Sequence, residues 1–389
     1  MPTADTLIRS VLAVPLNVPV NIDVASARQR SHLSCCLVSI ETAGGLIGYG
    51  FTAITEEEVV ATIIREVVAP SLIGQDALAH EAIWERLFWL LAPRGQSGYA
   101  SHAIAAIDVA LWDLKGKSLG QPIWRLLGGA RAKVPVYATF GFGFFDRDQL
   151  AEAARLWHAQ GYTRLKMTVG NHALARRDEP RPVDAVIAED IRRIRAVRDA
   201  VGDDVSLYVD ANCGLDAISA TRLAGEMEAL GVAGFEEPVK DNDCLQLAQL
   251  RQRTRIPLSA GQNEGHAWRF RDFLLHQSLD TVQPNVVITG GYTQCIGIAK
   301  MAAAFNVAVS NGGAWAPFNM HLHAGLAHGG LVEQHYVASL VLEAIYDGLP
   351  TPQQGQINLP DAPGLGFAPN ADRVRELAKL PLSRGTGKA

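Results

Sequence analysis

Five acidic or amide residues follow short apolar runs at nearly equal intervals in the second half of the chain. They are Asp210 in SLYVDAN, Glu236 in GFEEPV, Gln262 in PLSAGQN, Asn285 in TVQPNVV and Asn311 in AVSNGG, at steps of 26, 26, 23 and 26 residues. Carboxylate and amide oxygens are the ligands that hard divalent cations prefer. The first three are therefore predicted to hold such a cation, with Glu264 as an alternative third ligand.

Each interval has the length of one strand, one helix and two loops, so each polar residue is expected at the end of a strand. In a (β/α)8 barrel these strand ends converge on one mouth, which holds the active site. Short β-branched runs alternate with amphipathic helical stretches, which is typical of parallel βαβ units. The eight predicted strands are 134–141, 163–169, 206–212, 234–239, 257–263, 281–287, 307–312 and 331–336. The pattern predicts an α/β protein with a (β/α)8-type (TIM-like) barrel.

The N-terminal part of the chain has a different pattern. SCCLVSIETAGGLIGYGF (34–51) predicts a hairpin around Gly-Gly, and helices are predicted at 56–70 and 78–92. We divide the chain into an α+β domain at 1–130, the barrel at 131–350 and a C-terminal segment at 351–389. The charged stretch 175–182 is expected to be a loop beside the barrel mouth.

Composition restricts the class of protein. The chain is 48% hydrophobic and 19% charged, with a net charge of −5, which gives no reason to expect a nucleic-acid partner. No run of 18 apolar residues is present, so no membrane span is expected. The five cysteines lack zinc-ligand spacing. These features indicate a reduced, cytoplasmic protein.

Several motifs, in this order, resemble the mandelate racemase and muconate lactonizing enzyme branch of the enolase superfamily. They are AIDVALWDLKGKSLGQPIWRLLGG (106–129), YVDAN, FEEP, the strand-end G-x-N, TGGYTQ (289–294) and LPDAPGLGF (359–367). The resemblance covers nearly the whole chain. It implies that the N-terminal domain caps the barrel mouth, with flexible loops near 16–30 and 51–56, and that the C-terminal segment packs back on this capping domain. It also implies a homo-oligomer that binds Mg2+ and a small carboxylate substrate.

This sequence departs from the family pattern at the positions that usually exchange protons. The family's second strand carries Lys-x-Lys; an ungapped alignment places Lys166 on the first lysine and Thr168 on the second, which is the usual base. A gapped alignment places Arg164 and Lys166 on the pair instead. Asn285 and Asn311 stand where the branch has an aspartate and a histidine, and Gln262 stands where the third ligand is usually acidic.

The resemblance leaves three candidates for acid–base catalysis. Lys166 is a candidate base if its pKa is lowered, and a neutral Glu333 is a candidate acid. His321 is the best placed of the histidines, and the others considered are His172, His266 and His323. The expected substrate contacts are Thr168, Asn212, Asn285, Asn311 and Trp315.

The resemblance therefore implies an enzyme that removes the proton next to the carboxylate of a small hydroxy acid or sugar acid. The reaction would continue through an enediolate to dehydration or epimerisation. Dehydration is favoured, because two-base epimerisation needs two opposed bases and both usual positions are neutral here. The alternatives are cycloisomerisation of a lactone or anhydro acid, and a binding protein that has kept the barrel but lost catalysis.

Overall fold

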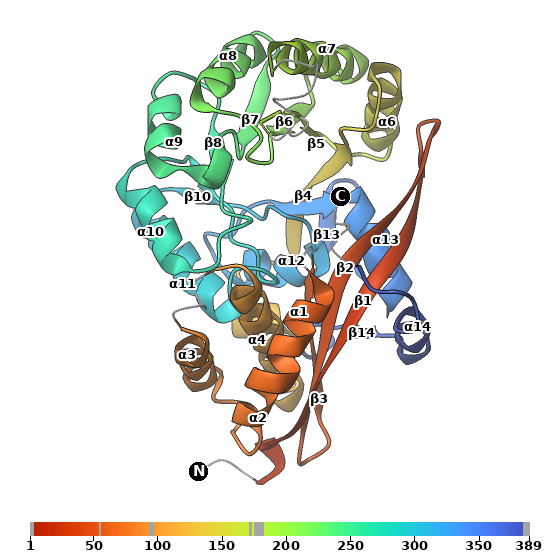
Figure 1. Cartoon of the computed structure of the whole chain (residues 1–389), viewed down its shortest axis with the longest axis vertical. Helices are drawn as coiled ribbons and strands as arrows, with labels where there is room; N and C mark the ends of the chain where they lie inside the picture. Colours follow the sequence, from red (N-terminus) through yellow and green to blue (C-terminus); the bar gives the residue numbers. More distant parts are fainter. Residues whose placement is uncertain (1–3, 54–55, 93–96, 171–172, 175–182, 384–389) are drawn as a thin grey trace.

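The computed structural model of the chain consists of an N-terminal sheet-and-helix unit that lies against a barrel (Figure 1). It describes residues 4–53, 56–92, 97–170, 173–174 and 183–383. His172, the 175–182 stretch and part of the expected 51–56 loop lie outside the described residues.

The N-terminal unit is built on a three-stranded antiparallel sheet in the order β1-β2-β3. Its strands are β1 (Ile8–Val24), β2 (Ala27–Thr42) and β3 (Ile47–Ala53), preceded by the 3-10 helix η1 (Ala4–Thr6). Its helices are α1 (Glu57–Thr62), the π-helix η2 (Ile63–Val68), α2 (Ala69–Leu72), α3 (His80–Leu91) and α4 (Tyr99–Ser118). The predicted hairpin is formed by β2 and β3. Helix α4 packs tightly on β3, since a Cβ at Gly50 would overlap the carbonyl oxygen of Ala106.

The expectation of a flexible loop at 16–30 is wrong. These residues continue β1 and begin β2, with a turn at Ala25 and Ser26 that has positive φ angles. The physical reason is a period-two pattern in β1, in which Leu16, Val18, Val20 and Ile22 are buried and alternate with more exposed residues. The prolines in β1 are tolerated because it is an edge strand.

All eight predicted barrel strands are present. They are β4 (Lys133–Gly141), β5 (Arg164–Thr168), β6 (Ser206–Asp210), β7 (Val232–Glu236), β8 (Leu258–Ala260), β9 (Thr281–Val282), β10 (Ala308–Val309) and β11 (Val332–His335). They pair in parallel in the order β10-β9-β8-β7-β6-β5-β4-β11. The backbone N–H of Asn311 donates to the carbonyl of Leu331 at 2.8 Å, which joins the two ends of this order. The protein therefore has the capped TIM-like barrel fold that the sequence predicts.

Helices connect the strands and cover the outside of the sheet (Figure 1). They are α5 (Ile123–Leu126), α6 (Arg147–Ala159), α7 (Val183–Val201), α8 (Ala217–Glu228), η4 (Lys240–Asn242), α9 (Cys244–Arg251), α10 (Ala267–Leu275), α11 (Gly291–Ala304), α12 (Ala316–Gly325) and α13 (Tyr336–Ile345). After α13 the chain forms β12 (Tyr346–Asp347), β13 (Gln356–Asn358), β14 (Ala368–Pro369) and α14 (Ala371–Leu377). This final segment contacts both units, since β13 pairs with β4 and the N–H of Leu365 donates to Asp113 of α4 at 2.8 Å.

Aromatic and polar contacts connect the N-terminal unit to the barrel. Phe51 of β3 packs against Trp315 and Phe318, with ring centroids 4.9 and 5.2 Å apart. On the neighbouring side, the carboxylate of Asp108 accepts the backbone N–H of Thr293 at 3.0 Å. The residues after strand β10 therefore lie directly under the end of β3.

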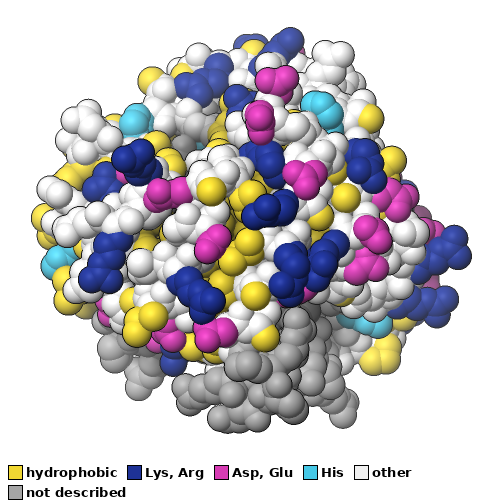
Figure 2. Space-filling view, turned by 90° about the horizontal axis from the view of Figure 1, so that it is seen from above, with side chains coloured by type: hydrophobic (Ala, Val, Ile, Leu, Met, Phe, Trp, Pro, Cys, Tyr) yellow, Lys and Arg dark blue, Asp and Glu magenta, His cyan; other side chains and the backbone are white. Residues whose placement is uncertain are grey.

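Charges of both signs are interspersed over the described part of the face in Figure 2, which looks down on the helices at the top of Figure 1. Ion pairs such as Arg147–Glu189, at 2.6 Å, connect the neighbouring helices α6 and α7. Among the described residues, no helix has both the length and the apolar character needed to cross a membrane.

Candidate active site

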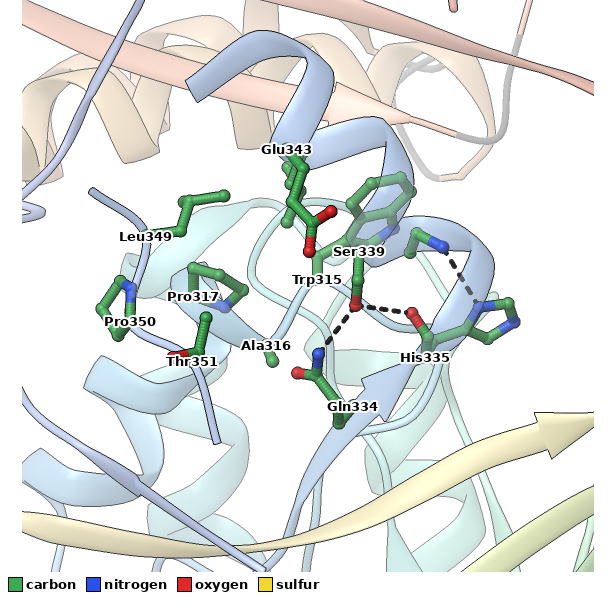
Figure 3. Close-up of a pocket in the computed structure, with 12 residues that line it drawn as sticks. Trp315, Ala316, Pro317, Gln334, His335, Ser339, Glu343, Leu349, Pro350 and Thr351 are labelled. Carbon is green, nitrogen blue, oxygen red and sulfur yellow. Dashed lines mark hydrogen bonds between the residues drawn. The ribbon is translucent and has the colours of Figure 1, made fainter. Parts of the chain in front are cut away.

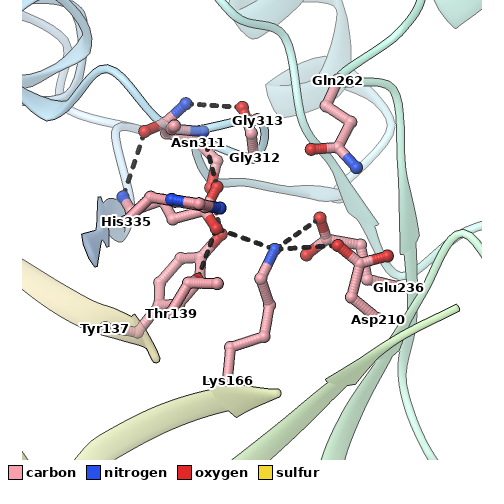
Figure 4. Close-up of polar contacts among 12 residues, drawn as sticks. Tyr137, Thr139, Lys166, Asp210, Glu236, Gln262, Asn311, Gly312, Gly313 and His335 are labelled. Atoms are coloured by element: carbon pink, nitrogen blue, oxygen red, sulfur yellow. Dashed lines mark hydrogen bonds and ion pairs between the residues drawn. The ribbon is translucent and has the colours of Figure 1, made fainter. Parts of the chain in front are cut away.

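Four charged side chains meet at the carboxyl ends of the barrel strands (Figure 4). The Nζ atom of Lys166 lies 3.1 Å from Oδ2 of Asp210 and 2.8 Å from Oε1 of Glu236. The same atom lies 3.0 Å from Oε1 of Glu333. Strand register produces this meeting, because Asp210 pairs directly with Glu236 between β6 and β7. All four side chains are buried, with exposed fractions of 4% or less.

This cluster contains three carboxylates and only one ammonium group. Burial lowers the pKa of Lys166, but the carboxylates of Glu236 and Glu333 outweigh burial and raise it well above its usual range. Burial also raises the pKa of Glu236, and Asp210 and Glu333 add to the rise while Lys166 opposes it. The pKa values of both Lys166 and Glu236 are therefore raised, and the cluster has fewer positive than negative groups. The lowered pKa expected for a basic Lys166 is not produced by these side chains.

Glu333 is held as a carboxylate by three donors. It accepts from Lys166, from the hydroxyl of Thr139 and from the backbone N–H of Ala314, the last at 2.7 Å. Burial opposes ionisation, but Lys166 and these hydrogen bonds leave the pKa of Glu333 below its usual value. In this arrangement the contacts therefore favour the ionised form of Glu333 over the neutral, proton-donating form that the sequence led us to expect.

Gln262 follows β8 and lies on the same side of the cluster as Asp210 and Glu236 (Figure 4). Its Nε2 donates to Oε2 of Glu237 at 2.7 Å. A carboxylate accepts hydrogen bonds and does not donate them, so the NH2 group of Gln262 faces Glu237. The amide oxygen of Gln262 therefore faces the residues drawn in Figure 4. The alternative ligand Glu264 is engaged elsewhere, since Arg269 donates to it at 3.0 Å.

The donor set fits a hard cation. Among the described residues, no group of three His, Cys, Asp or Glu side chains is arranged to hold a metal ion. Asp210, Glu236 and the Gln262 amide nevertheless supply three oxygens, and the buried cluster carries an excess of negative charge. Mg2+ prefers oxygen ligands and would supply the missing positive charge.

Asn285 and Asn311, two of the expected substrate contacts, are hydrogen-bonded to the backbone. Both are fully buried. Asn285 Nδ2 donates to the carbonyls of Gly312 and Gly313 at 2.7 and 3.0 Å. The side-chain oxygen of Asn311 accepts the N–H of Glu333 at 3.0 Å, and its Nδ2 donates to Gly312 at 2.8 Å. Both asparagines therefore hold backbone near Glu333 in place.

The loop held by Asn285 has an unusual backbone. Gly313, Ala314 and Trp315 have φ angles of 72, 70 and 66°, a region that alanine and tryptophan rarely adopt. Asn319 supports this conformation by donating to the carbonyls of Ala314 and Trp315, both at 3.2 Å. The strained loop aims the N–H of Ala314 at Glu333, in keeping with the concentration of backbone strain at functional sites.

The other three expected substrate contacts differ in position. Thr168 pairs with Asp210 across β5 and β6, and its hydroxyl donates to the carbonyl of Gly141 at 3.2 Å. Asn212 is exposed, and its backbone N–H donates to Oδ1 of Asp210 at 2.8 Å. Trp315 is 1% exposed and packs on Phe51 of the N-terminal unit. Trp315 therefore packs against the N-terminal unit, whereas Thr168 and Asn212 lie beside Asp210.

Trp315 also lines a small cavity between the start of α12 and α13 (Figure 3). The cavity has a volume of about 30 Å3. Its lining includes His335, Ser339, Glu343 and Thr351. This volume accommodates a water-sized group rather than a sugar acid.

His321 lies apart from the charged cluster and is not a candidate for catalysis. Its imidazole is fully buried on α12, where Nε2 lies 3.1 Å from the carbonyl oxygen of Leu365. Burial lowers the pKa of His321 to about 4. His323 is likewise buried on α12 and has its pKa lowered by burial to about 3, and His266 packs against Trp84 and Trp268 of neighbouring elements.

His335 does belong to the cluster, and the sequence analysis missed it. It follows Glu333 by two residues on β11, so both side chains lie on the same face of the strand. Figure 4 shows its imidazole beside Thr139 and above Lys166. Its Nδ1 accepts the N–H of Ala338, in the first turn of α13, at 3.3 Å. The signal in the sequence was the period-two alternation of strand residues in VEQH (332–335), which places His335 on the same face as Glu333.

The electrostatics of His335 favour a neutral ring. Burial lowers its pKa, and Lys166 adds to this effect, whereas Glu333 opposes it. Because Nδ1 accepts a hydrogen bond, the proton of the neutral imidazole lies on Nε2. His335 is therefore a neutral hydrogen-bond donor whose orientation is set by a helix N-terminus.

Two further residues that the sequence analysis did not identify support the carboxylates. Gln283 donates from Nε2 to Oε2 of Glu236 at 2.8 Å. Tyr137 lies under Lys166, with its ring centroid 5.5 Å from Nζ, and its hydroxyl donates to the carbonyl of Asn311 at 2.6 Å. Neither has a sequence signal of its own beyond a position inside or after a barrel strand.

Comparisons with known proteins agree with this architecture. Residues 5–128 match the model of the mandelate racemase / muconate lactonizing enzyme N-terminal domain, and residues 148–373 match the enolase C-terminal domain-like model. The chain is 30% identical to arabinonate dehydratase of Saccharolobus solfataricus, over 84% of this chain and 86% of that one. It is 31% identical to 3,6-anhydro-alpha-L-galactonate cycloisomerase of Streptomyces coelicolor, over 88% and 90%.

A solved structure shares the whole architecture. A racemase from Streptomyces coelicolor A3(2), determined with bound magnesium, superposes with a TM-score of 0.85 at 28% identity, covering 95% of this chain and 99% of that chain. The similarity therefore extends over both the N-terminal unit and the barrel.

Proposed function

Because the chain belongs to the mandelate racemase / muconate lactonizing enzyme family of the enolase superfamily, whose named relatives are dehydratases and cycloisomerases, we propose that it is a Mg2+-dependent sugar-acid dehydratase. The observation that carries the proposal is the buried cluster of three carboxylates around one lysine at the barrel mouth. A negatively charged substrate would be repelled there unless a cation compensated the carboxylates.

The metal would be held by Asp210, Glu236 and the amide oxygen of Gln262. Bound Mg2+ would supply positive charge beside the substrate carboxylate. Asp210 and Glu236 would then no longer stabilise the ammonium form of Lys166, so its amine could accept a proton. Lys166 remains the basic side chain of the cluster, and we assign to it the removal of the proton next to the carboxylate. Glu333, 3.0 Å from Lys166, is positioned to keep that amine oriented toward the substrate.

Loss of the hydroxyl from the neighbouring carbon needs a donor, and we assign this role to His335. A neutral imidazole whose Nδ1 accepts from a helix N-terminus presents its Nε2–H to a substrate oxygen. The electron pair of the broken C–H bond forms the carbon–carbon double bond. The hydroxyl leaves as water with the proton that Lys166 took from carbon, while the Nε2–H of His335 donates a hydrogen bond to the leaving oxygen. The resulting enol becomes a 2-keto acid. Two opposed bases, as epimerisation requires, are not supported because Asn285 and Asn311 are engaged with the backbone.

Proton NMR in D2O, with Mg2+ and a panel of sugar acids, tests the proposal. We expect the signal of the proton next to the carboxylate to disappear together with the appearance of 2-keto-acid signals. Loss of that signal with retention of the hydroxyl would indicate epimerisation, and ring opening of an anhydro acid would indicate the cycloisomerase alternative.

The control for metal dependence is Glu236→Gln, which removes one ligand charge without changing side-chain size. This variant should abolish turnover. Full activity of Glu236→Gln would overturn the metal assignment. Absence of exchange by the wild-type protein across the panel, with metal binding demonstrated, would favour a non-catalytic binding protein.

A further inference from the structure

Glu237 is a buried carboxylate that sits next to the proposed metal ligands but faces away from Lys166. It directly follows Glu236 and has a φ angle of 43°, which turns its side chain away from that of Glu236. Its backbone is fixed on both sides, since its N–H donates to Ser259 at 2.9 Å and its carbonyl accepts from Cys213 at 2.8 Å. Glu237 is 0% exposed. A buried carboxylate with fixed backbone needs specific partners.

The partners of Glu237 are primary amides. Oε2 accepts from Gln262 at 2.7 Å, and Oε1 accepts from Asn242 at 2.9 Å. Asn263 donates to both oxygens, at 3.1 and 3.0 Å. Burial and the charge of Asp210 raise the pKa of Glu237 to about 7, while the hydrogen bonds from Gln262 and Asn242 oppose that rise. Both oxygens of Glu237 are engaged by neighbouring amides, which fixes the carboxyl group in the wall of the site.

The consequence for Gln262 is a fixed orientation. With its NH2 group committed to Glu237, its oxygen has to face the interior, where a Cβ on Gly313 would lie only 3.1 Å from it. A hydrogen bond from an amide N–H to a carboxylate also increases the electron density on the amide oxygen. Gln262 is thereby made a better oxygen ligand than a free amide.

We propose that Glu237 is the positioning residue of the metal site: it accepts the hydrogen bond from the NH2 group of Gln262 and thereby orients the Gln262 oxygen toward the cation. The inference rests on the proposed Mg2+ dependence. It explains how an amide in the third ligand position is held with its oxygen, rather than its NH2 group, available to the cation. Outer partners of this kind typically change metal affinity 10- to 100-fold.

The test measures Mn2+ binding to the full chain, with the free ion detected by electron paramagnetic resonance. This measurement requires no substrate. We expect Glu237→Gln to weaken binding at least 10-fold relative to wild type. The exchange variant Glu237→Gln/Gln262→Glu moves the charge into the ligand and keeps a donor–acceptor pair, so it should recover affinity to within about threefold, well inside the 10- to 100-fold range of such partners. Glu226→Gln removes an exposed carboxylate on helix α8 and is the control, with unchanged affinity expected.

The outcomes distinguish failure of the proposed function from failure of the role proposed for Glu237. If wild type does not bind Mn2+, the proposed function fails. If wild type binds and Glu237→Gln binds equally well, the role of Glu237 is overturned while the proposed function stands. Failure of the exchange variant to recover affinity, with native circular dichroism, would also overturn the role, as would equal weakening by Glu226→Gln. Should Glu237→Gln not fold, the exchange variant and the control still decide the question.

Discussion

Lys166 and Glu333 lie on opposite sides of strand β4, and their side chains meet above it with Nζ 3.0 Å from Oε1. Thr139 of β4 donates to the same carboxylate oxygen. This pair connects the two halves of the candidate site, since Lys166 also contacts Asp210 and Glu236. Lys166 thus contacts all three carboxylates of the cluster, and its removal should affect both stability and metal binding.

Lys166→Met should destabilise the metal-free protein by about 3 kcal/mol or more, because it leaves buried carboxylates without a cation. Mg2+ should raise the melting temperature of this variant more than that of wild type, since a cation then compensates the carboxylates. Thermal unfolding with and without Mg2+ measures both effects. Lys379→Met breaks an exposed ion pair at 2.7 Å and is the control, with a change below about 0.5 kcal/mol. Equal stability of Lys166→Met and wild type would contradict the role of Lys166 in compensating the three carboxylates.

His335→Asn should separate the two chemical steps. Exchange of the proton next to the carboxylate should continue in D2O, because Lys166 is unchanged. Formation of the keto acid should slow by about 100-fold or more, because the leaving oxygen loses the hydrogen bond from Nε2 of His335. Parallel NMR measurement of exchange and product formation tests this. If both rates fall equally, His335 acts before water loss and its assignment as the donor to the hydroxyl is wrong.

Asn285→Asp should destabilise the fold although it restores the family's residue. Its Nδ2 donates to the carbonyls of Gly312 and Gly313, and a carboxylate would face those oxygens with no proton to donate. We expect a loss of about 1–3 kcal/mol in urea unfolding, the cost of unsatisfied buried polar groups. The loss should be larger at pH 8 than at pH 5, because the introduced carboxyl group is forced to ionise at the higher pH. Unchanged stability would show that the loop does not depend on Asn285.

His321 should contribute to acid sensitivity. Burial lowers its folded-state pKa to about 4, below the unfolded value of about 6.5. The unfolded chain therefore binds a proton in this window that the folded protein does not, so stability is fully present above pH 6.5 and falls as pH decreases toward 4. The slope from this residue is about 1.4 kcal/mol per pH unit. His321→Gln should flatten the pH dependence of urea unfolding between pH 6.5 and 4, and an unchanged slope would contradict a neutral buried His321.

Much of the barrel was predictable because its signal is local and repeated. Apolar β-branched runs, each followed by a polar residue after a nearly constant interval, locate Asp210 and Glu236 at strand ends without any knowledge of contacts. Parallel strands in register then bring consecutive strand ends together, as the pairing of Asp210 with Glu236 demonstrates. Residues 16–30 form strands instead of the loop that the family resemblance implied, because their own period-two alternation buries one face of β1.

The polar network was not predictable, because it depends on which atom of each side chain faces which neighbour. The sequence alone determined the fold class, the family resemblance and the substitutions that remove the usual bases. Only the tertiary structure decided that Asn285 and Asn311 hold backbone rather than substrate, that His321 packs against the C-terminal segment while His335 joins the cluster, and that Glu237 contacts Gln262. The physical reason is that periodicity specifies which face of an element a residue lies on, whereas hydrogen-bond partners and pKa shifts arise from contacts between residues distant in sequence.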